Sequence, residues 1–74
     1  MKKSLEEIKD LSKAGNKVDL ILSAEDYELI ELMDIAKISG LLGWKITLTN
    51  CKEMNNKELI ELLKHSEDLT FDLR

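Results

Sequence analysis

Three short segments constrain what this chain can fold into, because each alternates apolar and polar residues beside a stretch of helical periodicity. They are Gly15–Ile21 (GNKVDLI), Gly43–Asn50 (GWKITLTN) and Ser66–Asp72 (SEDLTFD). Period-2 alternation over such a length is typical of a β-strand with one buried face. The sequence therefore predicts an α/β domain made of three helix–strand units.

The predicted helices begin at pairs that resemble a capping box, in which an acid follows a Ser or Asn by three positions. The pairs are Ser4 with Glu7, Ser23 with Asp26, and Asn55 with Glu58. Gly15 is expected to cap the end of the first helix, and the second should end near residues 39–43. We therefore expect one domain, residues 1–74, with units at about 4–23, 24–51 and 55–74.

An internal repeat is a further prediction from the same pattern. The pentapeptide ELIEL occurs at Glu28–Leu32 and again at Glu58–Leu62, and the pattern G-x-K-(V/I)-x-L begins at both Gly15 and Gly43. The spacings between the units are unequal, so convergent α/β patterning stays open as the alternative.

The arrangement of the strands follows from their separation by helices, which requires parallel pairing through right-handed crossovers. Polar residues alternate with the apolar ones in every strand, so one sheet face should meet water. Right-handed crossovers keep all helices on the other face only if the strands are laid down in one direction. We expect a small two-layer αβαβαβ domain with a parallel sheet of order 1-2-3 rather than 2-1-3.

Composition excludes several classes of function. The 74 residues include fifteen acids and eleven bases, a net charge of −4, which disfavours binding to a nucleic-acid backbone. No apolar stretch approaches the roughly 18 residues of a membrane span, and the first residues do not resemble a signal peptide. The single cysteine, Cys51, excludes an internal disulfide framework and suits a reducing compartment. We expect a cytoplasmic protein that binds neither nucleic acid nor membrane.

The residues that carry chemistry are sparse. Cys51 and His65 are the only cysteine and histidine, and the helix between them should place them at opposite ends of the sheet. A Cys–His nucleophile is therefore improbable, and one residue of each type cannot form a zinc site. We expect no catalytic site and no cofactor.

One segment resembles a known family. Ile46-Thr47-Leu48-Thr49-Asn50-Cys51 is similar to the L-x-L-x-x-(N/C) segment of leucine-rich repeats, and the apolar residues that follow, up to Leu69, are similar in placing to the helix side of the cysteine-containing type. The resemblance covers residues 46–69, about one repeat. It implies a binding scaffold whose strand face meets a protein partner.

We therefore expect a non-catalytic module that binds a protein partner or a second copy of itself. Its candidate surface is the polar sheet face, together with the outer edge of the last strand, which should lack a neighbour. The candidate residues are Asp19, Ile21, Thr47, Thr49, Thr70, Asp72 and Arg74. A rival helix-side contact consists of Tyr27, Ile35 and Ile38. Trp44 is expected to pack against the helices.

Two alternatives stay open. The chain could be a small acidic inhibitor or antitoxin-like protein that masks a basic partner through the acids of its second helix, which are Glu25, Asp26, Glu28, Glu31 and Asp34. It could also hold a small ligand or an enzyme site at the loops after the first two strands, around Ser23, Asn50 and Cys51.

Overall fold

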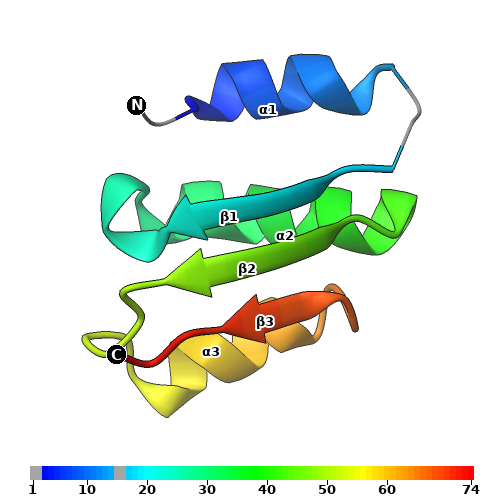
Figure 1. Ribbon diagram of the computed structural model, residues 1–74. Coiled ribbons are helices and arrows are strands. Elements are labelled where there is room, and N and C mark those ends of the chain that lie inside the picture. The colour runs from blue at the N-terminus through cyan, green and yellow to red at the C-terminus, as the bar shows by residue number, and fades with distance from the viewer. Residues whose placement is uncertain (1–2, 15–16) are drawn as a thin grey trace.

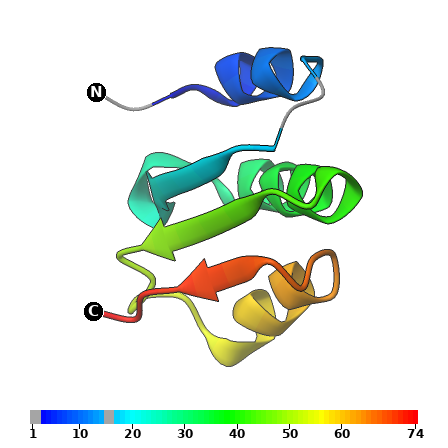
Figure 2. The same cartoon turned by 45° about the vertical axis from the view of Figure 1, so that its right-hand side comes forward.

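The computed structural model describes residues 3–14 and 17–74, and these ranges form a three-stranded sheet with helices on one side (Figures 1 and 2). The elements are α1 (Leu5–Ser12), β1 (Asp19–Ser23), the 3-10 turn η1 (Ala24–Asp26), α2 (Leu29–Leu42), β2 (Lys45–Thr49), α3 (Asn56–Leu63) and β3 (Leu69–Phe71). The strands are parallel, in the order β1-β2-β3. The predicted α/β fold and strand order are confirmed.

The register of the sheet separates an apolar face from a polar one. Ile46 pairs with Leu20 on one side and with Leu69 on the other, and Leu48 pairs with Leu22 and Phe71. These side chains point toward the helices, where Ile46 and Leu48 are almost completely buried. Trp44, immediately before β2, is also completely buried, as predicted.

Two of the predicted helix starts are confirmed. The Ser4 hydroxyl accepts a hydrogen bond from the Glu7 N–H at 3.2 Å, and the Glu7 carboxylate accepts one from the Ser4 N–H at 3.1 Å. Asn55 and Glu58 make the same reciprocal pair at the start of α3, at 2.9 and 3.0 Å. Gly15, the expected cap at the end of α1, lies outside the described residues, and α1 ends at Ser12.

The predicted start of the second helix was wrong. Ser23 begins the short turn η1 and makes no capping bond, and α2 begins only at Leu29. The Ser23 hydroxyl instead accepts a hydrogen bond from the Asn50 side chain at 2.8 Å. The N–H of Glu28 donates to the Glu31 carboxylate at 2.9 Å, so an acid three residues further on caps this helix.

The two ELIEL segments begin at different places in their helices. Glu28 precedes the first residue of α2, whereas Glu58 is the third residue of α3. The internal repeat therefore stays a prediction.

The C-terminal end of α2 approaches the loop before β3 very closely. Gly43 ends the helix in the left-handed conformation, with φ of 68°, as expected for a C-terminal glycine. A Cβ atom placed on Gly40 would lie 1.9 Å from the carbonyl oxygen of His65. Beside this contact the hydroxyls of Ser39 and Ser66 are 2.7 Å apart, and both side chains are buried.

Candidate functional site

The sheet face opposite the helices, called the open face below, carries three cross-strand rows of side chains, of which the row at the carboxyl ends is Ser23 with Thr49. In the central row Ile21 pairs with Thr47, and Thr47 pairs with Thr70. Asp19 and Lys45 form the row toward the amino ends of the strands. Ile21 is 77% exposed, so a large apolar side chain projects from the edge strand β1 of an otherwise polar surface.

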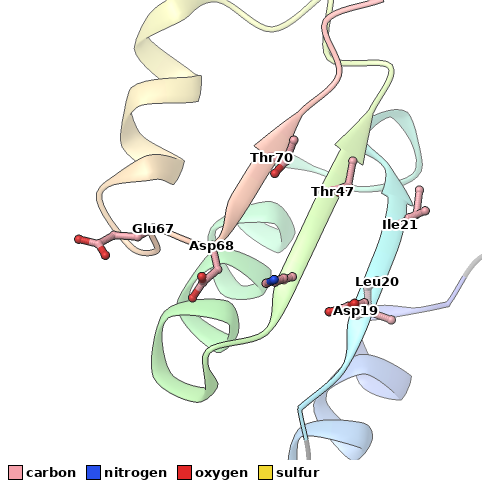
Figure 3. Close-up of a pocket in the computed structure, with 8 residues that line it drawn as sticks. Asp19, Leu20, Ile21, Thr47, Glu67, Asp68 and Thr70 are labelled. Atoms are coloured by element: carbon pink, nitrogen blue, oxygen red, sulfur yellow. The ribbon is translucent and has the colours of Figure 1, made fainter.

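A shallow hollow of about 480 Å³ covers the amino-terminal half of this face (Figure 3). It contains side chains from all three strands and from the turn before β3. The lining residues are Asp19, Leu20, Ile21, Lys45, Thr47, Glu67, Asp68 and Thr70. Three of these are acids and one is a base, so the hollow is electronegative. Figure 3 shows Thr47, Thr70 and Ile21 on neighbouring strands of the same face, with Asp19 and Asp68 near their amino ends.

The remaining candidate residues lie toward the carboxyl ends of the strands and outside this hollow. Asp72 binds the guanidinium of Arg74 through two hydrogen bonds, at 3.0 and 2.9 Å. These side-chain bonds, together with one from the Arg74 N–H, lower the pKa of the Asp72 carboxyl. Thr49 is half-buried and its hydroxyl lies 3.4 Å from the carbonyl oxygen of Leu22. The candidate set is thus divided between two ends of the open face.

Sequence reasoning did not select four residues of the hollow as candidates, namely Leu20, which was assigned to the core face, and the polar residues Lys45, Glu67 and Asp68. Lys45 shares the parity of Thr47, so the alternation of β2 could have identified it. Glu67 and Asp68 belong to the turn before β3, where no periodicity indicates which way a side chain points. The carbonyl oxygen of Asp68 accepts a hydrogen bond from the N–H of Ile46, which fixes this turn beside β2.

The rival helix-side surface was a wrong expectation. Ile35 is completely buried and Tyr27 is only 9% exposed, because α1 packs against α2. The Tyr27 hydroxyl donates to the carbonyl oxygen of Lys3, just before α1. Ile38 is half-buried at the margin of the core. The apolar residues that the second helix carries beyond its sheet-facing side therefore pack against the first helix.

The acids of the second helix are partly occupied by local structure. The Glu31 carboxylate accepts the helix-start hydrogen bond described above, and Asp34 lies 3.8 Å from the ammonium group of Lys9 in α1. The acids therefore do not form one free surface, which weakens the inhibitor alternative.

The loops after β1 and β2 do not bring their three polar residues into one cavity. The Asn50 amide bonds to Ser23, as noted, and Asn50 itself adopts a left-handed conformation with φ of 57°. Cys51 points inward and its thiol donates to the carbonyl oxygen of Leu48 at 3.2 Å. A hollow of about 240 Å³ is lined by Asn50 but not by Ser23, and one of about 290 Å³ is lined by Ser23 but not by Asn50. Cys51 lines neither of them.

Cys51 is expected to resist thiol reagents in the native protein. The side chain is completely buried, and burial raises the pKa of its thiol, so little reactive thiolate is present at neutral pH. Labelling with a chromogenic disulfide should be at least about 100-fold slower than in denaturant. Equal rates in the two conditions would show that the thiol is accessible.

Comparison of the chain with protein-family models, curated proteins and solved structures found no match. None of the helices within residues 3–14 and 17–74 has the length and apolar character needed to cross a bilayer. In the same ranges, no three side chains of His, Cys, Asp or Glu gather as metal ligands would.

Proposed function

We propose that this chain is a non-catalytic interaction module that binds a protein partner through the open face of its sheet. The observation that carries the proposal is the exposed Ile21 side chain on the edge strand of an uncovered, hollowed sheet face. A sheet normally has helices on both faces, or it has helices on one face and a uniformly polar second face in contact with water. An apolar side chain within a polar rim instead suits a small protein contact.

The partner is a protein with basic residues around an apolar contact. Three carboxylates, those of Asp19, Glu67 and Asp68, surround the hollow, against the single ammonium group of Lys45. The side chains of Thr47 and Thr70 are uncharged, and burying them costs less than burying ions. The resemblance of residues 46–69 to a leucine-rich repeat supports the same choice of face.

The test introduces bulk and positive charge at the centre of this face. The double variant Thr47→Arg, Thr70→Arg leaves the helix layer untouched, and Asn56→Arg adds the same side chain to the exposed start of α3 as the control. A protein captured from the native host by the wild type is first purified. Calorimetry should then give a Kd at least about tenfold higher for the double variant, and an unchanged Kd for the control.

The two variants separate the possible interfaces. An unchanged Kd for the double variant would exclude the open face, and a raised Kd for Asn56→Arg alone would place the contact on the helix side. Circular dichroism must show that both variants keep the wild-type fold.

A further inference from the structure

The outer edge of β3 presents backbone groups without a partner. The carbonyl oxygen of Asp68 accepts from the Ile46 N–H at 3.2 Å, and the Asp72 N–H donates to the Leu48 carbonyl oxygen at 2.8 Å. Even-numbered residues of this strand therefore bond to β2, and odd-numbered ones point their N–H and C=O groups outward. The outward residues are Leu69, Phe71 and Leu73, and no partner for their backbone groups is found among the described residues.

The outer edge of β1 lies against a hollow of about 290 Å³. Four consecutive strand residues, Leu20–Ser23, line this hollow, with Lys3, Asp26 and Tyr27 around them and no residue of β2 or β3. Because Ile46 and Leu48 bond to β3, Thr47 must bond to β1. Its register partner, Ile21, then directs its own N–H and C=O groups outward, into the hollow.

The helix layer extends further than the sheet at this edge. Figure 1 shows α1 beyond β1, with no strand in front of it. Apolar side chains at both edges are incompletely buried, namely Leu5, Val18 and Leu20 near β1 and Phe71 in β3. The corresponding residues of the central strand, Ile46 and Leu48, are buried. A strand added beside β1 would complete the burial of these edge residues.

We infer that β3 of one copy of this chain pairs in parallel with β1 of a second copy. Thr70 of the first copy then stands opposite Ile21 of the second, which continues the row Ile21–Thr47–Thr70 across both sheets. In this register the outward N–H of Leu73 meets the carbonyl oxygen of Ser23. Phe71 comes to lie on the core side, next to Leu20 and Leu22.

Charge does not select this arrangement. In this register Asp68 of the first copy stands opposite Asp19 of the second, although Lys17, which precedes β1, lies near the same end. At the other end Asp72 is already bound to Arg74 of its own chain, and the β1 hollow carries both Lys3 and Asp26. The parallel direction instead follows from keeping the helix layers of both copies on the same side of the continued sheet.

This pairing is head to tail, so it leaves a free β1 edge and a free β3 edge at the two ends of every open assembly. Repetition gives a growing series or a closed ring rather than a fixed dimer. The interface is small, so each contact is weak. The inference uses the sheet edges, not the open face, and it stands or falls independently of the partner proposed above.

Two pairs of variants test the edges by sedimentation velocity up to about 1 mM protein. Leu73→Pro removes the outward N–H of β3 and keeps the bond of Asp72 to β2, whereas Leu73→Ala keeps the N–H. Ile21→Pro and Ile21→Ala do the same for β1. Each proline variant should raise the apparent Kd of self-association at least about tenfold, and each alanine variant less than about threefold.

A mixing experiment identifies the direction of pairing. The Ile21→Pro variant keeps a usable β3 edge, and the Leu73→Pro variant keeps a usable β1 edge. An equimolar mixture should therefore form a 1:1 dimer that does not grow further. Undiminished association of Ile21→Pro by itself, with no heterodimer in the mixture, would show β3-to-β3 pairing and overturn the inference.

The wild type supplies a readout that does not depend on the variants folding. Hydrogen exchange at the Ile21 and Phe71 amides should slow as the protein concentration rises, while the first turn of α3 keeps its exchange rate. A constant monomer mass, with exchange independent of concentration, would overturn head-to-tail pairing.

Discussion

Replacing Trp44 with alanine is expected to lower the free energy of unfolding by about 4 kcal/mol. The indole is completely buried where β2 begins, and the Trp44 carbonyl oxygen accepts a hydrogen bond from the Ser39 hydroxyl at 2.7 Å. The chain has only three aromatic residues, so few side chains could close the resulting cavity. Chemical denaturation followed by far-UV circular dichroism measures the loss. A domain of this length is typically stable by about 4 to 11 kcal/mol, so the variant should be close to unfolding.

Two control variants show whether the loss comes from the cavity. Trp44→Phe keeps an aromatic ring and should lose clearly less stability than the alanine variant. Ile21→Ala truncates an exposed side chain and should change the free energy of unfolding by less than about 0.5 kcal/mol. A loss below about 1 kcal/mol for Trp44→Ala would contradict the burial of the indole.

Replacing Gly40 with alanine is expected to lower the free energy of unfolding by about 2 kcal/mol, although alanine favours helices. The added Cβ would lie 1.9 Å from the His65 carbonyl oxygen, so α2 and the turn before β3 must separate. Such overpacking costs about 3 kcal/mol, and the better helix propensity of alanine offsets about 1 kcal/mol. The separation should also weaken the buried hydrogen bond between Ser39 and Ser66, 2.7 Å long.

A double-mutant cycle measures this link between Gly40 and the serine pair. If the steric contact acts through the turn, Ser66→Ala should cost less stability in the Gly40→Ala background than in the wild type. Lys37→Ala, at an exposed position of the same helix, is the control for helix propensity alone and should be neutral or slightly stabilising. A stabilising Gly40→Ala substitution would contradict the close approach.

The sheet could be predicted from the sequence because strand alternation fixes side-chain direction. Once Ile46 and Leu48 are assigned to the core, the pleat places Lys45 and Thr47 on the other face. The same parity in all three strands leaves one face polar, and right-handed crossovers then determine the strand order. Local chemistry was thus enough for the layers and the topology.

The start of the second helix could not be predicted, because it depends on a contact between distant residues. Serine is a residue type favoured at helix starts. The hydroxyl of Ser23, however, accepts a hydrogen bond from the side chain of Asn50, 27 positions away. Glu28 takes over the start of the helix through its N–H bond to the Glu31 carboxylate. A capping pattern in one sequence cannot reveal a competing partner contributed by the loop after another strand.

The candidate site was predictable only where it lies on strands. Ile21, Thr47 and Thr70 were placed on one face by alternation, and the register brings them into one row. Glu67 and Asp68 were not chosen because their turn has no period. Ile35 was mistaken for a surface residue because helical periodicity does not show which neighbouring helix will cover it.

The consecutive order of the strands has a consequence for how this chain folds. Each strand pairs only with the strand next to it along the chain, so no sheet contact has to wait for a distant segment. Loop closure therefore costs less entropy than in a parallel sheet whose neighbouring strands are further apart in the sequence. During synthesis, β1, α2 and β2 can assemble as soon as Thr49 has left the ribosome, and α3 with β3 then adds to a template that already exists.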